Sequence, residues 1–181
     1  MVNTRGVRMA RWLGTLMAVA WLAPGAQAAE GRATTVPMVT MKVREVRTDR
    51  GSPVVLLEHG RSVIPIYIGT AEAQAIQMRL NQQKAVRPLT HDLLETMLLV
   101  MGARIERVEV DDLRDNIFFG KVTLKDAKGR RYRIDGRPSD LIALAVGAKL
   151  SVQVAAHVLR KAGVDAATWS APTPAPQPPT Y

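Results

Sequence analysis

Residues 104 to 147 read RIERVEVDDLRDNIFFGKVTLKDAKGRRYRIDGRPSDLIALAVG. Alternation of apolar and polar residues predicts three strands in this stretch, and Asp, Asn and Gly residues predict tight turns between them. The predicted order is strand 104–110, turn 114–116, strand 117–125, turn 126–129 and strand 130–135. Ser139 then caps a predicted helix that ends near Gly147. Three consecutive strands with short turns indicate an antiparallel sheet, and the helix that follows indicates a layer packed on it.

The first of these strands departs from strict alternation. Ile105 is out of phase with Val108 and Val110, so one face of a regular strand cannot hold all three side chains. We therefore expect a β-bulge near Ile105.

The rest of the chain alternates strand and helix signals in the same way. Residues 39–47 and 54–58 predict a hairpin with a turn at 49–51. Pro65, in a third predicted strand, indicates an edge position or a bulge, because proline cannot donate to a ladder. The other predicted elements are this strand at 63–68, a helix 70–82 capped by Thr70, a helix capped by Thr90 and ending at Gly102, a short strand 152–154 and a helix ending at Gly163. Together they predict the α+β (α/β) class, a single domain with a mostly antiparallel mixed sheet and helices packed on one side.

The first 28 residues have the three parts of a cleavable export signal. Three arginines precede the apolar run 12–23, which is shorter than the roughly 20 residues that a membrane-spanning helix needs. Residues 26–28 read AQA, the small-x-small pattern of a signal-peptidase site, so we expect cleavage after Ala28. The alternative is an uncleaved N-terminal anchor. Cleavage predicts a periplasmic or secreted protein with no stable membrane anchor.

The composition fits one folded domain after the signal. Cleavage would leave 153 of the 181 residues, with 22 basic and 16 acidic side chains, enough chain for one domain with a hydrophobic core. The absence of cysteine excludes a lipoprotein anchor and a disulfide framework. We expect a lead-in at 29–37, a folded domain at 38–163 and a disordered, Pro-rich tail at 164–181. The excess of positive charge favours polyanionic partners such as nucleic acid, anionic membrane surfaces or acidic glycans.

Chemically useful side chains gather in three segments, each at a turn or at the start of a helix. They are Arg87, His91 and Asp92 in the first segment, Asp111, Asp112, Arg114 and Asp115 in the second, and Arg137, Ser139 and Asp140 in the third. The chain has no Walker loop and no G-x-G-x-x-G, H-E-x-x-H or G-x-S-x-G motif. Its three histidines make a multi-histidine zinc site improbable.

Two interpretations of these segments stay open from the residues alone. Thr90 and Ser139, each followed by an acidic residue, are what ordinary helix capping requires. Arg87 and Arg137 beside the same helix starts favour anion sites, because free backbone N–H groups and guanidinium groups both suit phosphate. Likewise, the acidic turn 111–115 is either solvated surface or a site for a hard cation such as Mg²⁺ or Mn²⁺.

Four blocks of the sequence resemble the bifunctional nuclease domain, a family named for members with both DNase and RNase activity. The blocks are IPIYIGTAEAQAI (64–76), RPLTHDLL (87–94), IERVEVDDLRDNIFFGKVTL (105–124) and IDGRPSDLIALAV (134–146). The resemblance covers residues 38 to 163, and it implies an α/β domain that forms a dimer, with a groove as the active site. It also implies functional positions, at His91, Asp92, Asp112, Arg114, Asp115, Arg137, Ser139 and Asp140.

The sequence therefore predicts an exported nuclease that hydrolyses DNA and RNA with little sequence specificity. In the predicted mechanism His91 is the general acid or base, Asp92 or Asp140 orients it, and Arg137 binds the phosphate. A divalent metal would be held by Asp111, Asp112 and Asp115, and the substrate would also contact Arg87, Arg114 and Ser139. One alternative is a non-enzymatic, homo-oligomeric binding or scaffold module of the cell envelope. Another is a hydrolase of a different anionic envelope substrate.

Apolar residues cover more than one face of the predicted helix that begins at Thr90. Its Leu, Met and Val side chains exceed what one contact with a sheet requires. The excess is buried either in a thick core or in a subunit interface, and we expect a homodimer.

Overall fold

The computed structural model describes residues 36–169 of the chain. The predicted export signal at 1–28, most of the lead-in at 29–37 and residues 170–181 lie outside the described residues. The strands are β1 (Met38–Asp49), β2 (Ser52–His59), β3 (Ser62–Tyr67), β4 (Arg104–Arg114), β5 (Ile117–Lys125), β6 (Arg131–Gly136), β7 (Val152–Ala155) and β8 (Val164–Asp165). The helices are α1 (Thr70–Leu80), α2 (Thr90–Val100), α3 (Pro138–Gly147), α4 (Ala156–Ala162) and α5 (Ala166–Trp169).

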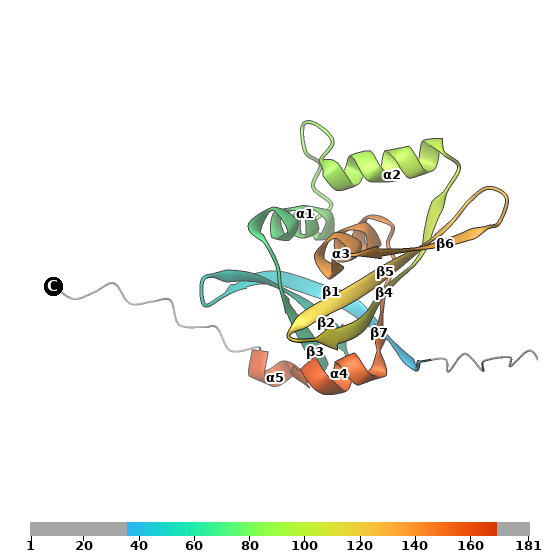
Figure 1. Cartoon of the computed structure of the whole chain (residues 1–181). Helices are drawn as coiled ribbons and strands as arrows, with labels where there is room; N and C mark the ends of the chain where they lie inside the picture. The colour runs from blue at the N-terminus through green and yellow to red at the C-terminus, as the bar shows by residue number, and fades with distance from the viewer. Residues whose placement is uncertain (1–35, 170–181) are drawn as a thin grey trace, which may run out of the picture. The chain divides into compact units, whose positions relative to one another are not determined.

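The strands form one mixed sheet in the order β6-β5-β4-β7-β1-β2-β3-β8 (Figure 1). Neighbouring strands are antiparallel except β4 and β7, which run parallel from the pair Val108 and Val152 to the pair Val110 and Val154. Strand β7 thus joins two groups of antiparallel strands, β4 to β6 and β1 to β3 with β8. The predicted class, α+β with a mostly antiparallel mixed sheet, is confirmed.

Strand β4 carries the bulge predicted at Ile105 and a second bulge that the sequence analysis did not predict. Its register with β5 shifts between Ile105 and Arg107, and again between Val110 and Asp112. The strand continues to Arg114, so the prediction of an acidic turn at 111–115 is wrong for Asp111 and Asp112. The turn itself is made by Asp115 and Asn116, at φ values of 48° and 61°, and residues with short polar side chains tolerate this left-handed region.

The core lies between the sheet and the two helices α1 and α3. Helix α3 contributes Leu141, Ile142 and Leu144, all buried, which meet buried valines from the central strands. Leu141 packs on two glycines, since a Cβ atom at Gly120 would lie 2.9 Å from its Cδ1 atom and one at Gly136 would lie 3.0 Å from its Cδ2 atom. The missing side chains therefore let α3 approach β5 and β6 closely. Figure 1 shows α1, α2 and α3 above the strands, and the short helices α4 and α5 below them.

Three helix starts differ from the prediction by one or two residues. The N-caps are Gly69, Leu89 and Arg137, so the predicted caps Thr70, Thr90 and Ser139 are wrong. In each case the carbonyl of the residue before the helix already accepts the first helical bond, as Arg137 does from the N–H of Leu141 at 3.1 Å. The hydroxyl residue then lies inside the first turn. Pro138 occupies the first helical position of α3, where its fixed φ suits a helix start.

The chain after Gly163 is more ordered than predicted. Val164 and Asp165 form β8, which pairs with Val63 and Ser62, and α5 follows directly. The prediction of a disordered tail at 164–181 is therefore wrong for residues 164–169. Backbone hydrogen bonds between β8 and β3 order this segment, and composition alone did not predict that pairing. Among residues 36–169, no helix has both the length and the apolar character needed to cross a bilayer.

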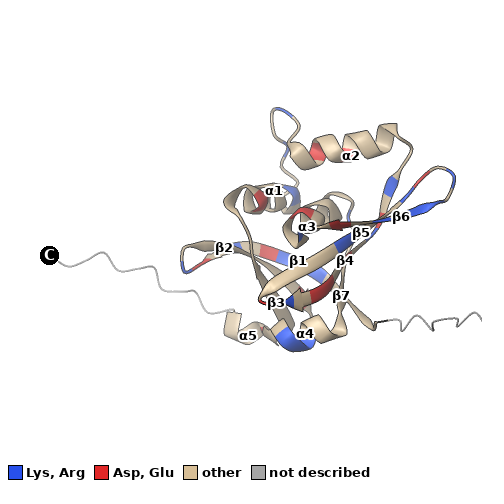
Figure 2. Ribbon diagram, viewed as in Figure 1, with Lys and Arg blue, Asp and Glu red and all other residues tan. Residues whose placement is uncertain are grey.

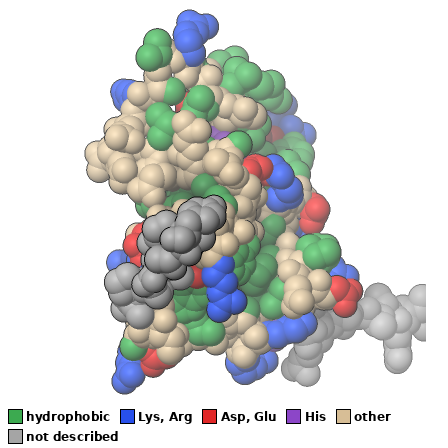
Figure 3. Space-filling view, turned by 90° about the vertical axis from the view of Figure 1, so that its left-hand side faces the viewer, with side chains coloured by type: hydrophobic (Ala, Val, Ile, Leu, Met, Phe, Trp, Pro, Cys, Tyr) green, Lys and Arg blue, Asp and Glu red, His purple; other side chains and the backbone are tan. Residues whose placement is uncertain are grey.

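The surface has two notable features. Basic and acidic residues lie close together along β4 and β6, and the charged residues of β5 are two lysines (Figure 2). Helix α2 has no buried residue, and hydrophobic side chains gather at the top of the molecule where it lies (Figure 3). The most exposed apolar side chains there are Leu93 (56%), Met97 (52%), Leu99 (77%), Val100 (82%) and Met101 (74%).

Candidate functional site

Arg79 of α1 contacts both of the neighbouring helices, α2 and α3. The Arg79 guanidinium, only 10% exposed, lies 2.6 Å from Asp92 Oδ1 and 2.5 Å from Glu95 Oε1, both on α2. It also donates to the Ala143 carbonyl of α3 at 3.1 Å. Gly147 leaves room for this arrangement, because a Cβ atom there would collide with Arg79 and Glu95. Arg79 therefore holds the first turn of α2 beside α3.

Four charged or titratable side chains meet where these three helices converge, and we call them the His91 cluster: Glu72, His91, Arg137 and Asp140. His91 Nε2 lies 3.2 Å from Asp140 Oδ1. Arg137 grips the same carboxylate with two nitrogens, at 2.7 Å and 3.2 Å, and its Nη2 atom also lies 2.8 Å from Glu72 Oε1. His91 and Glu72 are largely buried, whereas Arg137 is 68% exposed. The accessible cation of the cluster is thus Arg137, which the carboxylates of Glu72 and Asp140 hold in place.

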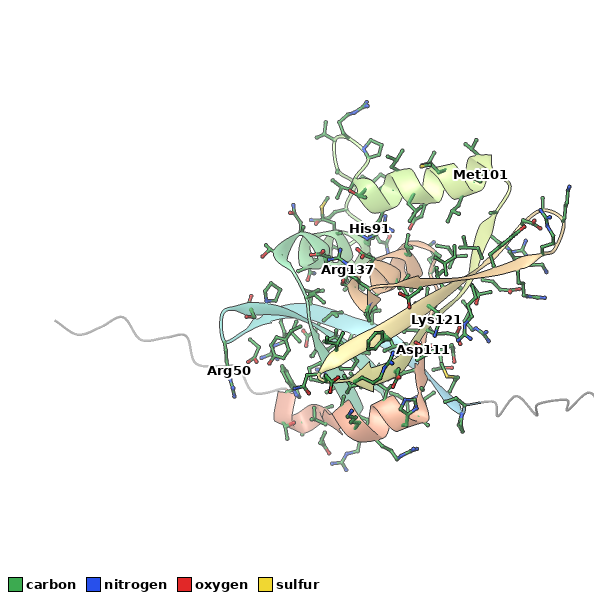
Figure 4. All side chains as sticks on the ribbon, in the orientation of Figure 1. Arg50, His91, Met101, Asp111, Lys121 and Arg137 are labelled. Carbon is green, nitrogen blue, oxygen red and sulfur yellow. The ribbon has the colours of Figure 1, made fainter. Side chains whose placement is uncertain are left out.

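The cluster borders a pocket of about 480 Å³ between α1 and the start of α2. Figure 4 shows His91 and Arg137 on either side of the space between these helices. The lining comes from α1, α2 and the N-terminal end of α3: Ala71, Glu72, Gln74, Ala75, Pro88, Leu89, Thr90, His91, Arg137 and Asp140. All four members of the cluster therefore face one cavity.

Arg137 is held as a cation with part of its donor capacity free. Hydrogen bonding to Asp140, followed by the charges of Asp140 and Glu72, raises the pKa of Arg137 above its ordinary value. The Nε and Nη2 atoms are engaged, but Nη1 has no hydrogen-bond or ion-pair partner among residues 36–169. Those N–H groups are available to an anion.

A second pocket, of about 550 Å³, lies on the other side of Arg137. Its lining comes from the β1–β2 turn, the end of β3, the β4–β5 turn and the start of α3: Gly51, Ser52, Pro53, Ile66, Tyr67, Ile68, Gly69, Thr70, Asn116, Ile117, Phe118, Arg137, Pro138 and Ser139. Arg137 is the one residue that borders both pockets. The predicted substrate residue Ser139 lies in this second pocket, two positions after Arg137.

The two aspartates predicted to orient His91 have different roles in the structure. Asp140 contacts the imidazole, as described above. Asp92 instead accepts a hydrogen bond from the Leu89 backbone N–H at 2.9 Å, and this bond caps the start of α2. Its ion pair with Arg79 attaches α2 to α1. The arrangement favours Asp140 as the residue that orients His91. Arg87 is exposed in the loop before α2, next to Pro88 of the first pocket.

The predicted metal residues do not converge. Asp111 pairs with Lys121 and lies 3.8 Å from Arg133, whereas Asp112 accepts the Leu113 N–H at 2.8 Å and lies 3.2 Å from His157. Asp115 occupies the turn beyond them. Within residues 36–169 no group of three His, Cys, Asp or Glu side chains is arranged to hold a metal ion. The three carboxylates therefore do not fit a shared metal site, because Asp111 and Asp112 are adjacent on a strand and contact different side chains, and Asp115 lies in the turn.

Asp112 belongs to a separate surface pair that the sequence analysis missed. The Leu113 N–H and then His157 lower the pKa of the Asp112 carboxyl below its usual value. Arg114, a predicted substrate residue, lies 3.0 Å from Asp112 and stacks over the Phe119 ring at 4.1 Å. Asp112 lies on β4 and its partner His157 on α4, away from the His91 cluster.

The sequence analysis also missed Glu72 of the His91 cluster. Its only local signal is an acidic residue in the first turn of α1, which helix-dipole stabilisation already explains. Its contact with Arg137 spans 65 residues of chain, and a sequence pattern does not reveal such a pairing.

Comparison with known proteins agrees with the four blocks quoted from the sequence. The bifunctional nuclease domain matches residues 54–167, more than half of the chain. Two Mycobacterium tuberculosis proteins, both described as uncharacterized, are 31% identical to this chain over 121 residues. They come from strains CDC 1551 / Oshkosh and ATCC 25618 / H37Rv, and the matched region covers 66% of this chain and 71% of each relative. The chain therefore belongs to the bifunctional nuclease domain family.

Proposed function

We propose that this protein is an exported nuclease that hydrolyses phosphodiester bonds in DNA and RNA with little sequence preference. The observation that carries the proposal is the convergence of His91, Asp140 and Arg137 on one pocket, in a chain that belongs to the bifunctional nuclease domain family. The predicted signal at 1–28 supports export to the periplasm or medium.

Each member of the His91 cluster has a role in the proposed reaction. Asp140 orients the His91 imidazole, which takes a proton from the attacking water or, in RNA, from the 2′-hydroxyl. The new P–O bond forms as the bond to the leaving oxygen breaks, and that oxygen takes up a proton from the imidazolium or from solvent water. Arg137 binds a non-bridging oxygen through its free Nη1 donors and stabilises the charge that develops there.

The charge of the cluster sets how strongly it attracts phosphate. Arg137 alone faces two carboxylates, so Glu72 and Asp140 oppose the approach of an anion. Once the His91 imidazole has taken the proton of the nucleophile, two cations balance two carboxylates as charge develops on the phosphate. Further attraction then comes from the unpaired N–H groups at the start of α3 and from Arg87 beside the pocket.

The test is a cleavage assay on the purified domain without its signal. Plasmid, single-stranded DNA and RNA are each incubated with Mg²⁺, with Mn²⁺ and with chelator, so the predicted metal requirement is measured in the same experiment. We expect cleavage of all three polymers, and loss of cleavage in His91→Ala by a factor of about 10² to 10⁴. A contaminating nuclease would survive in the His91→Ala preparation. If the wild-type domain cleaves none of the polymers, the non-enzymatic scaffold replaces the nuclease.

We also propose that the protein is a homodimer that pairs through α2. The exposed apolar side chains of α2 form a surface of the kind that monomers rarely leave in water. His91, Asp92 and Glu95 lie on the face of α2 that contacts α1 and α3. The exposed apolar residues of α2 remain accessible in the described part of the chain. Pairing at α2 would place two His91 clusters in one particle.

A further inference from the structure

We infer that the second pocket, which we call the Tyr67 pocket, binds the base of the nucleotide whose phosphate lies on Arg137. This inference deepens the proposed function and rests on it for the class of ligand. The pocket and the His91 cluster share Arg137. A phosphate at the Arg137 Nη1 atom would therefore have the His91 cluster on one side and the Tyr67 pocket on the other.

The walls of the Tyr67 pocket suit a flat, partly apolar ring. Two aromatic side chains, Tyr67 and Phe118, line it together with Ile117, which is 60% exposed. A nucleobase stacks on such rings whatever its identity, because every base has a π-face. The volume of about 550 Å³ lies within the usual range for small-molecule pockets, roughly 300 to 1,000 Å³.

Tyr67 is held in place before any ligand arrives. Its hydroxyl donates to Asp49 Oδ2 at 2.6 Å, and Asp49 is itself only 8% exposed. Tyr67 as a residue nevertheless stays 55% exposed and lines the pocket, so it is accessible to a ligand. A fixed ring loses little conformational freedom on binding, which favours affinity.

Ser139 supplies a polar contact inside the Tyr67 pocket. It is 92% buried, it lines the pocket, and its hydroxyl has no hydrogen-bond partner among residues 36–169. The hydroxyl itself keeps contact with solvent in the pocket, so a ligand atom can bond to it directly. Stacking with one or two polar contacts gives binding without strict base choice, as a nuclease of low specificity requires.

The structure offers a matched control for Tyr67. Tyr132 on β6 is 44% exposed and donates its hydroxyl to Asp126 Oδ2 at 3.1 Å, so it is also a half-exposed tyrosine bonded to an aspartate. It borders neither pocket. Tyr132→Ala therefore removes an equivalent ring from a different place.

The binding test uses adenosine 5′-monophosphate and ribose 5-phosphate, which differ only in the base, and follows titration by NMR or calorimetry. We expect the nucleotide to bind the wild-type chain more tightly by about 5- to 150-fold, the usual contribution of one stacked base. Tyr67→Ala should remove that advantage, whereas Tyr67→Phe, which keeps the ring, and Tyr132→Ala should retain it. Equal affinity for the two ligands, or an advantage that survives Tyr67→Ala in a folded protein, overturns the inference.

A kinetic test separates this inference from the proposed function. The kcat/KM values of thymidine 3′- and 5′-(4-nitrophenyl phosphate) are compared with that of methyl 4-nitrophenyl phosphate, which has no base. A higher value for at least one base-bearing ester, lost in Tyr67→Ala, supports the pocket. Turnover of all three esters at equal rates keeps the nuclease and overturns the pocket. Absence of cleavage of both these esters and the polymers, together with nucleotide binding that needs Tyr67, overturns the nuclease and supports the pocket.

Discussion

The imidazole of His91 reaches from α2 to the carboxylate of Asp140 on α3, with 3.2 Å between Nε2 and Oδ1. Asp140 lies at the point where three helices meet, and Arg137 holds it from the other side. The histidine, the carboxylate and the guanidinium therefore form one linked unit. Their substitutions should act on catalysis together, not independently.

Substitutions of Asp140 and Asp92 should have different effects, the first on catalysis and the second on stability. Asp140→Ala should lower cleavage with little change in melting temperature, because Asp140 is one-third exposed and contacts His91 and Arg137. Asp92→Ala should lower the free energy of unfolding by about 0.5 to 2 kcal/mol, the usual cost of a lost N-terminal cap. Loss of one partner of the buried Arg79 adds to this cost. Thermal melts beside cleavage assays decide the matter, and equal destabilisation by both variants would make Asp140 structural.

Arg137 should not tolerate lysine. An ammonium group cannot grip Asp140 with two nitrogens, reach Glu72 and still offer free donors to phosphate. We expect Arg137→Lys to reduce kcat/KM by at least about tenfold, equivalent to the loss of one charge-assisted hydrogen bond. Arg131→Lys is the control, since Arg131 also grips a carboxylate, that of Glu106, at 2.6 Å and 2.9 Å but far from both pockets. Equal losses in the two variants would show that Arg137 has no special role.

Substitution of Gly120 by any residue with a side chain should destabilise the fold. A Cβ atom there would lie 2.9 Å from both the Glu109 carbonyl oxygen and Leu141 Cδ1, closer than packing allows. Gly120→Ala should therefore lower the free energy of unfolding by about 1 to 3 kcal/mol in a denaturant titration. In the double variant with Leu141→Ala, part of this cost should disappear, because the side chain that collides is gone. Strictly additive effects would contradict the packing of α3 on β5.

Tyr67 should titrate above the ordinary range of a tyrosine. The hydrogen bond to Asp49, then burial and the Asp49 charge, raise the pKa of Tyr67 above its ordinary value near 10. Since the folded pKa is the higher one, its contribution to stability is complete below about pH 10 and is lost as pH rises through the folded value. The phenolate absorbance of Tyr67→Phe, subtracted from that of the wild type, isolates this titration. Asp49→Asn should lower the measured pKa, and an unchanged value would refute the assignment.

The dimer should depend on one helix. Leu93→Lys places a charge in the exposed apolar surface of α2, where it would be buried on pairing. We expect a dimer mass for the wild type and a monomer mass for Leu93→Lys by light scattering. Ile134→Lys, at a residue that is 47% exposed on β6, should remain dimeric. A monomeric wild type at high micromolar concentration would show that α2 is not a subunit interface.

Local sequence pattern predicted the features of this fold that depend on near neighbours. Strands β4, β5 and β6 follow one another through tight turns, so alternation and turn residues were sufficient, and the phase error at Ile105 marked a real bulge. The place of β7 between β4 and β1 was not predictable, because it depends on pairing across more than 40 residues of chain, as between Val108 and Val152.

The sequence predicted most residues of the candidate site, but not the contacts that they make with one another. His91, Arg137 and Asp140 were named from two segments with helix-start chemistry, and the structure brings them together. Glu72 was missed, and Asp111 and Asp112 were placed in a turn although they lie in β4. A bulge of one residue reverses the direction of the side chains that follow, and three acids within five residues give no signal of this reversal.

The position of β7 also governs when the chain can finish folding. Strands β1 to β3 emerge first from the ribosome, but they share a sheet with β4 to β6 only through residues 152–155. Until that late segment is available, the two groups of strands lack their common hydrogen bonds, and the contacts of α1 with α3 are what join them. This delay suits the export proposed above, because a secretion channel accepts an unfolded chain. Stalled chains that end before Val152 should accordingly be digested by protease, whereas chains extended beyond Trp169 and free of the ribosome should resist it.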